Sequence, residues 1–559
     1  MQHLPKRIKT PIFQHVKDAN PNWLVERYKE LGSVILLSKE LRAAGYIGAG
    51  KSQLYRLFDE RGYEVAPKGG VRKNSGPKKL PEKVKPIVGG MIEPQDVNRV
   101  AAKGTRFVFT SAQNNTLVHE KFLQSLKVFC NERNAELFIS RFSYNKSGFQ
   151  NGVKDGDSDE LFYDKRIKPY QFDTSMEITP SLIFCGELNI LPTAENPLSG
   201  FDNYTRQASA IIPHSKVQMK SVATMPEDQP KILYTTGAVT LRNYIQKKAG
   251  QKADFHHVFG ATYVEIAEDG THFVRQLIAD DSGEFYDLTD YFTPYGVQHG
   301  NRVEAINYGD IHIEKIDTAI AGISFHAPDS MLNTLRPRFQ LVHDIIDFSA
   351  RNHHNIKDPF HWAKMYHEKK DKVEDCIAMA AGFLNSIQRD DSETIVVESN
   401  HDLALKKWLS TADVTYDPVN AQFFHRASHI VHTAIEGRIE GFSIFEHLVR
   451  EFPGLERTKF LRENDSFQIA GNVECGLHGH LGPNGARGNP RNLRHLGRKA
   501  NTGHTHSAGI VDGVYTAGVT GTLDMGYNKG PSSWSHSHIV TYPNGKRTII
   551  TIKNGKWRA

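Results

Sequence analysis

Four clusters of acidic, imidazole and amide side chains occur between residues 309 and 506 of this 559-residue sequence. They are Gly309-Asp310-Ile311-His312, His343-Asp344-Ile345-Ile346-Asp347, Ser399-Asn400-His401-Asp402, and a region with two HxH pairs, His478-Gly479-His480 and His504-Thr505-His506. Carboxylate, imidazole and amide groups together suit Mn²⁺, Fe²⁺ or Zn²⁺ better than Ca²⁺. The clusters therefore predict a site for such a divalent ion.

The same mixture of ligands indicates which reaction the site would support. Two divalent ions about 3.5–4 Å apart can activate a water, neutralise phosphate oxygens and stabilise a leaving oxygen. A carboxylate must bridge the two ions to hold them together against their mutual repulsion. We therefore predict a two-metal phosphoesterase in residues 301–559.

The segments around the clusters explain how they could meet. Residues 302–312 and 393–402 are predicted to be strands that end in polar residues, and the first places Asp310 and His312 on one side. Open α/β sheets bind their ligands at the carboxyl ends of strands, so these ends should lie together. The chain closes with a predicted hairpin, in which Asn544-Gly545 supplies the turn.

Taken in order, the clusters resemble the five motifs of the calcineurin-like metallophosphoesterases, D-x-H, G-D-x-x-D, G-N-H-D/E, H and G-H-x-H. The resemblance implies a β-sandwich flanked by helices that holds two divalent ions, with Mn²⁺ favoured and Mg²⁺, Fe²⁺ or Zn²⁺ as alternatives. The chain departs from the pattern at His343 and Ser399, where the family usually has glycine. Neither departure removes a ligand, but the two loops are expected to differ in shape.

The resemblance implies a role for each residue that matches a motif. Asp310, His312 and His506 would bind the first ion, Asp344 would bridge, and the second ion would be bound by Asn400, His478 and His504. His401 would orient the phosphate or protonate the leaving oxygen, and Asp402 would hold the His401 ring. His480 is the alternative to His478, which we favour because His followed by Gly is the commoner family pattern.

The distribution of charge favours DNA as the substrate. The chain carries a net charge of +6, but Lys and Arg exceed Asp and Glu by 10 over residues 1–90, which leaves −4 for the rest. Cations that neutralise backbone phosphates strengthen binding to nucleic acid. A second basic stretch, residues 484–503, lies between the last two metal motifs and is predicted to contact DNA beside the metals; a solvated loop is the alternative. Its cations are Arg487, Arg491, Arg494, Arg498 and Lys499.

Composition divides the chain into four predicted parts. Residues 1–67 form a basic helical domain like a helix-turn-helix, 68–89 a linker rich in Lys, Gly and Pro, 90–300 an α/β domain of unknown role, and 301–559 the metallophosphoesterase domain. A β-strand, helix and second strand are predicted within 105–145. Residues 45–52 match the P-loop pattern, but the preceding segment is charged and helical where a P-loop needs a buried strand.

The whole chain resembles the early DNA-transfer nucleases of T5-like phages, whose catalytic half is similar to the SbcD-like nucleases. This implies a manganese-dependent, homo-oligomeric DNase of the infected bacterial cytoplasm that degrades host DNA or assists DNA transfer. The sequence lacks an apolar run of about 20 residues, so we predict no membrane span. Two other functions remain open, namely a phosphomonoesterase acting on protein or nucleotide, and a DNA-binding regulatory protein with a vestigial metal fold.

Overall fold

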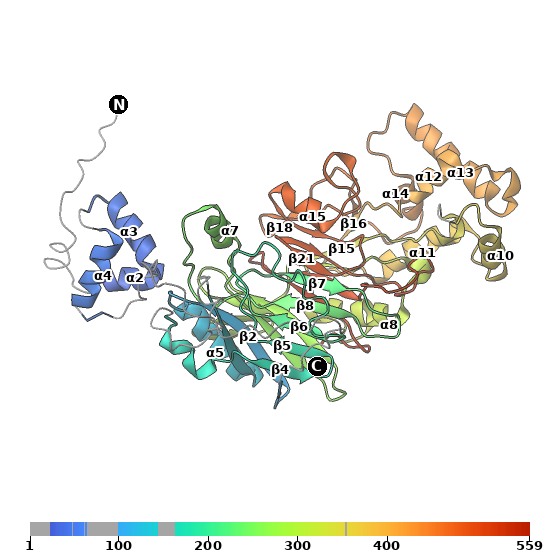
Figure 1. Cartoon of the computed structure of the whole chain (residues 1–559). Helices are drawn as coiled ribbons and strands as arrows, with labels where there is room; N and C mark the ends of the chain where they lie inside the picture. The colour runs from blue at the N-terminus through green and yellow to red at the C-terminus, as the bar shows by residue number, and fades with distance from the viewer. Residues whose placement is uncertain (1–22, 47–48, 61, 64–98, 144–161, 353–354) are drawn as a thin grey trace, which may run out of the picture.

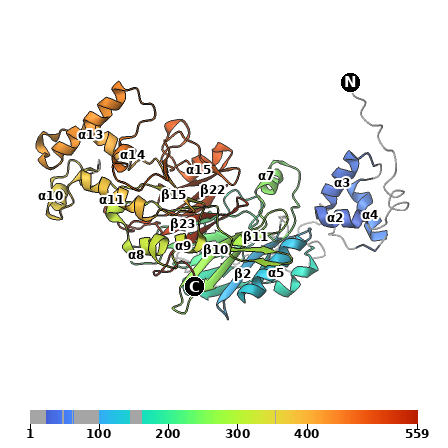
Figure 2. The same ribbon diagram turned by 180° about the vertical axis from the view of Figure 1, so that it is seen from behind.

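The computed structural model describes residues 23–46, 49–60, 62–63, 99–143, 162–352 and 355–559 (Figure 1). Within these residues the protein is of mixed α/β type, as predicted, with sheets of 11, 6, 4 and 3 strands. The predicted linker, 68–89, lies outside the described residues, as do residues 1–22. Figures 1 and 2 show a small group of helices at the N-terminal end, the sheets in the middle, and a helical extension at the far end. None of the described helices is long and apolar enough to cross a bilayer.

Three short helices form the N-terminal group, α2 (Trp23–Leu31), α3 (Val34–Ala43) and α4 (Lys51–Glu60), in the segment predicted to be helical. Their buried faces meet in a small core of their own, which includes Tyr28 and Phe58. The side chain of Ser33 accepts a hydrogen bond from the backbone N–H of Ile35 and caps α3. Because α3 precedes the P-loop-like sequence, the buried strand that a P-loop requires is replaced by a helix.

The predicted strand-helix-strand unit is present as β2 (Arg106–Gln113), α5 (Glu120–Arg133) and β3 (Glu136–Phe142), with β2 and β3 parallel. They join β9 (Gly260–Ile266) and β10 (His272–Ile278) in the four-stranded sheet, in the order β10-β9-β2-β3. One face of this sheet packs on α5 and on the three-stranded sheet of β11 (Phe285–Asp287), β12 (Asp290–Thr293) and β13 (Gly296–Gln298).

The 11-stranded sheet runs through both halves of the chain. Its first half contains β1 (Val100–Ala101), β4 (Ser175–Thr179), β5 (Leu182–Cys185), β6 (Ser209–Ile212), β8 (Lys231–Thr235) and β7 (Met219–Val222). The sheet continues with β21 (Gly509–Val511), β22 (Val514–Thr516), β20 (Lys499–Thr502), β19 (Val473–Glu474) and β18 (Gln468–Ile469). The two halves meet where β7 pairs with β21, so residue 300 does not separate two sheets.

The six-stranded sheet carries most of the predicted metal ligands. Its order is β17 (Thr458–Phe460), β16 (Glu393–Val397), β15 (Phe339–His343), β14 (Ala305–Asn307), β23 (Ser537–Thr541) and β24 (Arg547–Thr551). The strands β14 to β17 are parallel, and β23 and β24 form the predicted hairpin. Buried apolar runs such as that of β16 suit a strand covered on both faces.

Helices cover one face of the six-stranded sheet, and part of the 11-stranded sheet covers the other. The helices in this core are α8 (Thr318–Ala321), α9 (Met331–Leu335), α11 (Val373–Ser386), α12 (Ala404–Thr411), α13 (Pro418–Glu436) and α14 (Ile444–Val449). On the other face, β14, β15 and β16 share a core with β18 and β19. Other helices include α7 (Lys248–His256), α10 (Pro359–His367) and α15 (Pro490–Leu493).

Phe109 tests the core that holds the sheets together. It is fully buried, its ring centroid lies 4.3 Å from that of Phe184 in the 11-stranded sheet, and the same core includes Ile539 and Ile549 of the hairpin. We expect Phe109→Ala to lower the free energy of unfolding by about 3–5 kcal/mol, measured with urea, because the cavity cannot collapse. Tyr295→Ala, at an 88% exposed side chain, is the control. A loss below about 1 kcal/mol would contradict this packing.

Candidate metal centre

The predicted ligands meet at one edge of the two facing sheets. Asp310 and His312 follow β14, Asp344 follows β15, and Asn400 follows β16, so three neighbouring parallel strands present their ligands together. His478 follows β19 of the facing sheet, and the HxH pair of His504 and His506 follows β20. The structure therefore brings together all seven residues that the sequence predicted as ligands.

One half of the cluster contains two carboxylates and two imidazoles. Nε2 of His506 lies 3.0 Å from Oδ2 of Asp310 and 3.1 Å from Nε2 of His312. Nε2 of His312 lies 3.8 Å from Oδ2 of Asp344. The ligand atoms of these four residues all lie within 4.8 Å of one another, so they could hold a metal ion.

The other half is built around the same carboxylate oxygen. Nε2 of His478 lies 3.2 Å from Oδ2 of Asp344 and 3.1 Å from Oδ1 of Asn400. The ring centroid of His504 is 5.3 Å from that of His478. His480, the alternative ligand, instead places Nε2 2.9 Å from Oε1 of Glu463. The geometry thus favours His478, and Oδ2 of Asp344 faces imidazoles of both halves.

Two buried carboxylate oxygens in the cluster have no hydrogen-bond partner. A buried polar atom without a partner is costly, and such atoms are rare in folded proteins. Within the described part of the chain, Asp310 Oδ1 and Asp344 Oδ2 are buried in the cluster and lack a hydrogen-bond partner. A divalent ion bound by carboxylates and imidazoles fits this donor set.

The protonation states also suit a cation. Burial alone would raise the pKa of Asp310, but the imidazoles of His343 and His506 hold it well below its ordinary value. Burial likewise opposes ionisation of Asp344, yet His478 and His401 hold its pKa well below the usual range. Burial lowers the pKa of His504 to about 4. Charged carboxylates beside neutral imidazoles are the forms in which these residues bind metals.

The backbone is strained at four of the predicted ligands. The φ angles are 49° at His312, 46° at Asp344, 71° at His504 and 56° at His506. All four are positive and lie in the left-handed region that favours glycine. Each such residue costs on the order of 1–3 kcal/mol and persists only where its surroundings fix it. The fold therefore maintains an unfavourable backbone in order to direct these side chains into one space.

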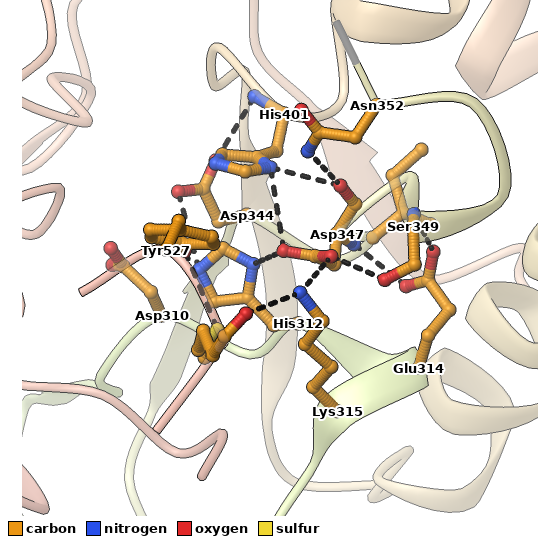
Figure 3. Close-up of polar contacts among 12 residues, drawn as sticks. Asp310, His312, Glu314, Lys315, Asp344, Asp347, Ser349, Asn352, His401 and Tyr527 are labelled. Carbon is orange, nitrogen blue, oxygen red and sulfur yellow. Dashed lines mark hydrogen bonds and ion pairs between the residues drawn. The ribbon is translucent and has the colours of Figure 1, made fainter. Parts of the chain in front are cut away.

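Asp347 orients two of the functional imidazoles, as Figure 3 shows. Its carboxylate lies 3.4 Å from Nδ1 of His312, and Nζ of Lys315 holds the other oxygen at 2.7 Å. Its backbone carbonyl lies 3.1 Å from Nδ1 of His401. When that nitrogen carries the proton, Nε2 of His401 is available to a substrate. Asp347 stands in the second motif, but the motif alone does not predict this double contact.

Asp402 does not hold the His401 ring, so that prediction is wrong. Its carboxylate accepts hydrogen bonds from the hydroxyl of Ser399 at 2.8 Å and from the backbone N–H of Ile346 at 3.2 Å. Both contacts tie the loop after β16 to the loop after β15. Asp402 therefore fixes the backbone that carries His401, and the ring itself is held by Asp347.

His343, at the position where the resembling family has glycine, enters the cluster. Its Nδ1 lies 2.7 Å from Oδ1 of Asp310 and 3.2 Å from Nδ1 of His478. Gly503 has no room for a side chain as a result, because an added Cβ would lie 2.1 Å from Cε1 of His343 and 2.2 Å from Oδ1 of Asp310. The sequence showed the departure from the motif but not where the ring would go.

Three residues near the C-terminus also support the site. Nδ1 of His538 accepts a hydrogen bond of 2.9 Å from the backbone N–H of Gly309, next to Asp310. The ring of Trp534 packs 4.2 Å from that of His506, and Tyr527 lies 6.0 Å from Trp534. These residues follow the last motif, so no spacing rule could identify them.

The structure separates the five basic residues that were predicted to lie beside the metals. Arg487 is exposed in the loop that pairs with Leu481, close to His480, and the exposed Arg491 follows in α15. Arg494 instead pairs with Asp512 at 3.1 Å and Glu195 at 3.3 Å, and Arg498 and Lys499 precede β20 or begin it. For these last three the predicted position beside the metal centre is wrong, because β20 separates them from the ligands that follow it. Their contact with DNA stays a prediction.

Replacing the shared carboxylate tests whether the cluster binds a metal. We expect Asp344→Asn to weaken Mn²⁺ binding at least tenfold, because it removes the charge that faces both halves of the cluster. Equilibrium dialysis with Mn²⁺ measures the bound metal. Asp390→Asn, at a fully exposed carboxylate, is the control. Equal Mn²⁺ binding by wild type and Asp344→Asn would exclude this cluster as the site.

Gly503 provides a second test that leaves every ligand in place. Gly503→Ala introduces a methyl group into the space of His343 and Asp310, both of which are buried and cannot move away. We expect about tenfold weaker Mn²⁺ binding and a lower thermal midpoint, at a cost of roughly 1–3 kcal/mol. Gly322→Ala, where nothing lies within 4 Å of the added Cβ, is the control. Unchanged metal binding in Gly503→Ala would show that His343 and Asp310 do not lie as close to Gly503 as described.

Comparison with known proteins places the chain among phage proteins. Protein A1 of Escherichia phage T5 is 45% identical over 487 residues, which make up 85% of each of the two chains. No family model matches the sequence, and no solved structure gives a significant match. The name of this relative states no activity, but its identity and coverage confirm the resemblance to a protein of a T5-like phage. This chain therefore belongs to the family of phage T5 Protein A1.

Proposed function

We propose that this protein is a metal-dependent deoxyribonuclease that hydrolyses phosphodiester bonds in DNA by a two-metal mechanism. The observation that carries the proposal is the position of Asp344, whose Oδ2 faces His312 on one side and His478 on the other. A carboxylate in that position suits a bridge between two cations. The facing sheets with helices on the outer side are also compatible with the metallophosphoesterase sandwich that the motifs imply.

The remaining ligands divide between the two proposed ions. Asp310, His312 and His506 would hold the first, and Asn400, His478 and His504 the second. When bound, two ions of this kind supply positive charge for phosphate oxygens and lower the pKa of a water. Mn²⁺ is the proposed ion, and Mg²⁺, Fe²⁺ and Zn²⁺ are the alternatives for the same groups.

His401 is the proposed catalytic residue that acts on the substrate. Its backbone N–H approaches Oδ1 of Asp344 at 3.3 Å, so the residue lies directly beside the proposed bridge. Its Nδ1 is engaged by the carbonyl of Asp347. The opposite ring nitrogen would orient the phosphate or give a proton to the departing oxygen.

DNA is the proposed substrate for two reasons. Arg487 and Arg491 are exposed in the segment that follows the His478–His480 loop, where they could contact backbone phosphates. The relationship to a phage protein also suits action on DNA in an infected bacterium. We further propose that the enzyme degrades host DNA or assists DNA transfer in the bacterial cytoplasm, as a homo-oligomer.

A phosphomonoesterase is the second candidate, because only two of the five predicted basic residues lie in the segment beside the metal centre. A phosphomonoesterase needs a metal pair but no extended row of Lys and Arg side chains to bind DNA. It would act on a protein or nucleotide, and it would require the same ligands and His401.

Digestion of linear and circular double-stranded DNA with Mn²⁺, Mg²⁺ or EDTA tests the proposal. We expect cleavage that requires metal and falls about 10²–10⁴-fold in His401→Ala, the usual range for general acid–base catalysis. His432→Ala, at an exposed histidine of α13, is the control. Cleavage that persists in EDTA would contradict the mechanism. Turnover of a small phosphate ester without cleavage of either DNA would favour the phosphomonoesterase.

A further inference from the structure

A cavity of about 890 Å³ lies where the two halves of the chain meet. Its walls come from α7, from the turns that precede β19, β20 and β22, and from the turn between β23 and β24. We call it the basic cavity, because its lining contains more cations than acids; the cations that matter below are Arg242, Lys499, Lys546 and Arg547. Its volume is within the usual range for small-molecule sites.

The basic cavity is separate from the metal centre. Asn472, Lys499 and Gly513 line it at the amino-terminal ends of β19, β20 and β22. The metal ligands follow the carboxyl ends of β19 and β20. A strand of four residues spans roughly 13 Å at about 3.3 Å per residue, so the sheet separates the two places.

The acids in the cavity wall already have cationic partners. Asp512 is bound by Lys216 and by Arg494, Glu195 by Arg494 and Lys252, and Asp281 lies 3.7 Å from Arg242. These pairs neutralise one side of the cavity. They leave no lining carboxylate unused among the described residues.

Three cations on the other side have no such partner. Across the described ranges, no carboxylate forms an ion pair with the charged groups of Lys499, Lys546 or Arg547. The buried guanidinium of Arg547 is held instead by the backbone carbonyls of Ala500 and Gly513, each at 2.9 Å. Burial and the charges of Lys546 and Arg547 lower the pKa of Lys499. Burial also lowers the pKa of Lys546, against the opposing charges of Asp281 and Asp280. The excess of positive charge on this side of the cavity would favour a bound anion.

An aromatic ring lines the same cavity as these charges. Phe255, in α7, lines the cavity and is 84% exposed. Its ring is therefore accessible to a ligand in the cavity. Cations along a groove combined with exposed aromatic rings are typical of sites that bind single-stranded nucleic acid, because the rings stack on bases while the cations meet phosphates.

We propose that the basic cavity binds the phosphate and base of a nucleotide unit, with Lys499, Lys546 and Arg547 facing the phosphate and Phe255 the base. The unit could be a free nucleotide or part of a DNA strand, which share this chemistry. The proposal takes from the proposed function only the class of ligand, and it does not depend on hydrolysis.

Binding measured in EDTA tests the cavity alone. The probes are thymidine monophosphate and a short fluorescein-labelled single-stranded oligodeoxynucleotide. We expect the double variant Lys499→Gln/Lys546→Gln to bind both probes at least tenfold more weakly. For the strand, a plot of the logarithm of the binding constant against the logarithm of the salt concentration should become less steep by roughly 1.4, about 0.7 for each lost phosphate contact. Lys406→Gln/Lys407→Gln, at two exposed lysines of α12, is the charge-matched control.

If the double variant loses binding of the oligodeoxynucleotide alone, the ligand is a DNA strand. If it also loses binding of thymidine monophosphate, the cavity is a nucleotide pocket. Equal binding by variant and wild type, or no binding of either probe by wild type, would overturn the proposal. A further check needs no variant: either bound probe should protect Lys499 and Lys546 of the wild-type protein from acylation. DNA cleavage that survives the loss of this binding would leave the proposed function intact.

Discussion

Buried negative charge is the constraint on which the rest of this structure depends. Asp310, Asp344 and Asp347 are all fully buried. Ionised carboxylates in a protein interior are stable only when cations or hydrogen bonds compensate them. Lys315 and His312 compensate Asp347, whereas Asp310 and Asp344 face mainly imidazoles. The two facing sheets must therefore end at the same edge, since one supplies the carboxylates and the other supplies His478, His504 and His506.

The loops at that edge accept local costs to meet this constraint. Ligand residues adopt left-handed backbone angles, and Gly503 leaves out a side chain so that His343 can reach Asp310. Asp402 and Asp347 then tie neighbouring loops and rings together. Charges arranged in this way would suit the electrostatic catalysis of the proposed nuclease, in which the charges are placed in advance. The same sheet that carries these loops forms the wall of the basic cavity at its opposite end.

The sequence predicted which residues would come together, because Asp310, His312, Asp344 and Asn400 follow neighbouring parallel strands, and strand order follows from simple α/β rules. It could not predict contacts set by side-chain direction within a loop, so the expected contact of Asp402 with His401 is absent and Asp402 faces Ser399 and Ile346. The predicted position of Arg494, Arg498 and Lys499 beside the metal centre is wrong, because closeness in sequence to the last motif ignores the strand β20 that lies between. The pairing of β7 with β21 joins segments hundreds of residues apart and leaves no local pattern.

Anomalous X-ray diffraction from crystals grown with Mn²⁺ would test the central claim most directly, because it locates the ions without reference to activity. The account predicts two peaks about 3.5–4 Å apart, with the Asp344 carboxylate between them. One peak should contact His312 and His506, and the other Asn400 and His478. A single peak, or peaks that do not share Asp344, would contradict the two-metal account.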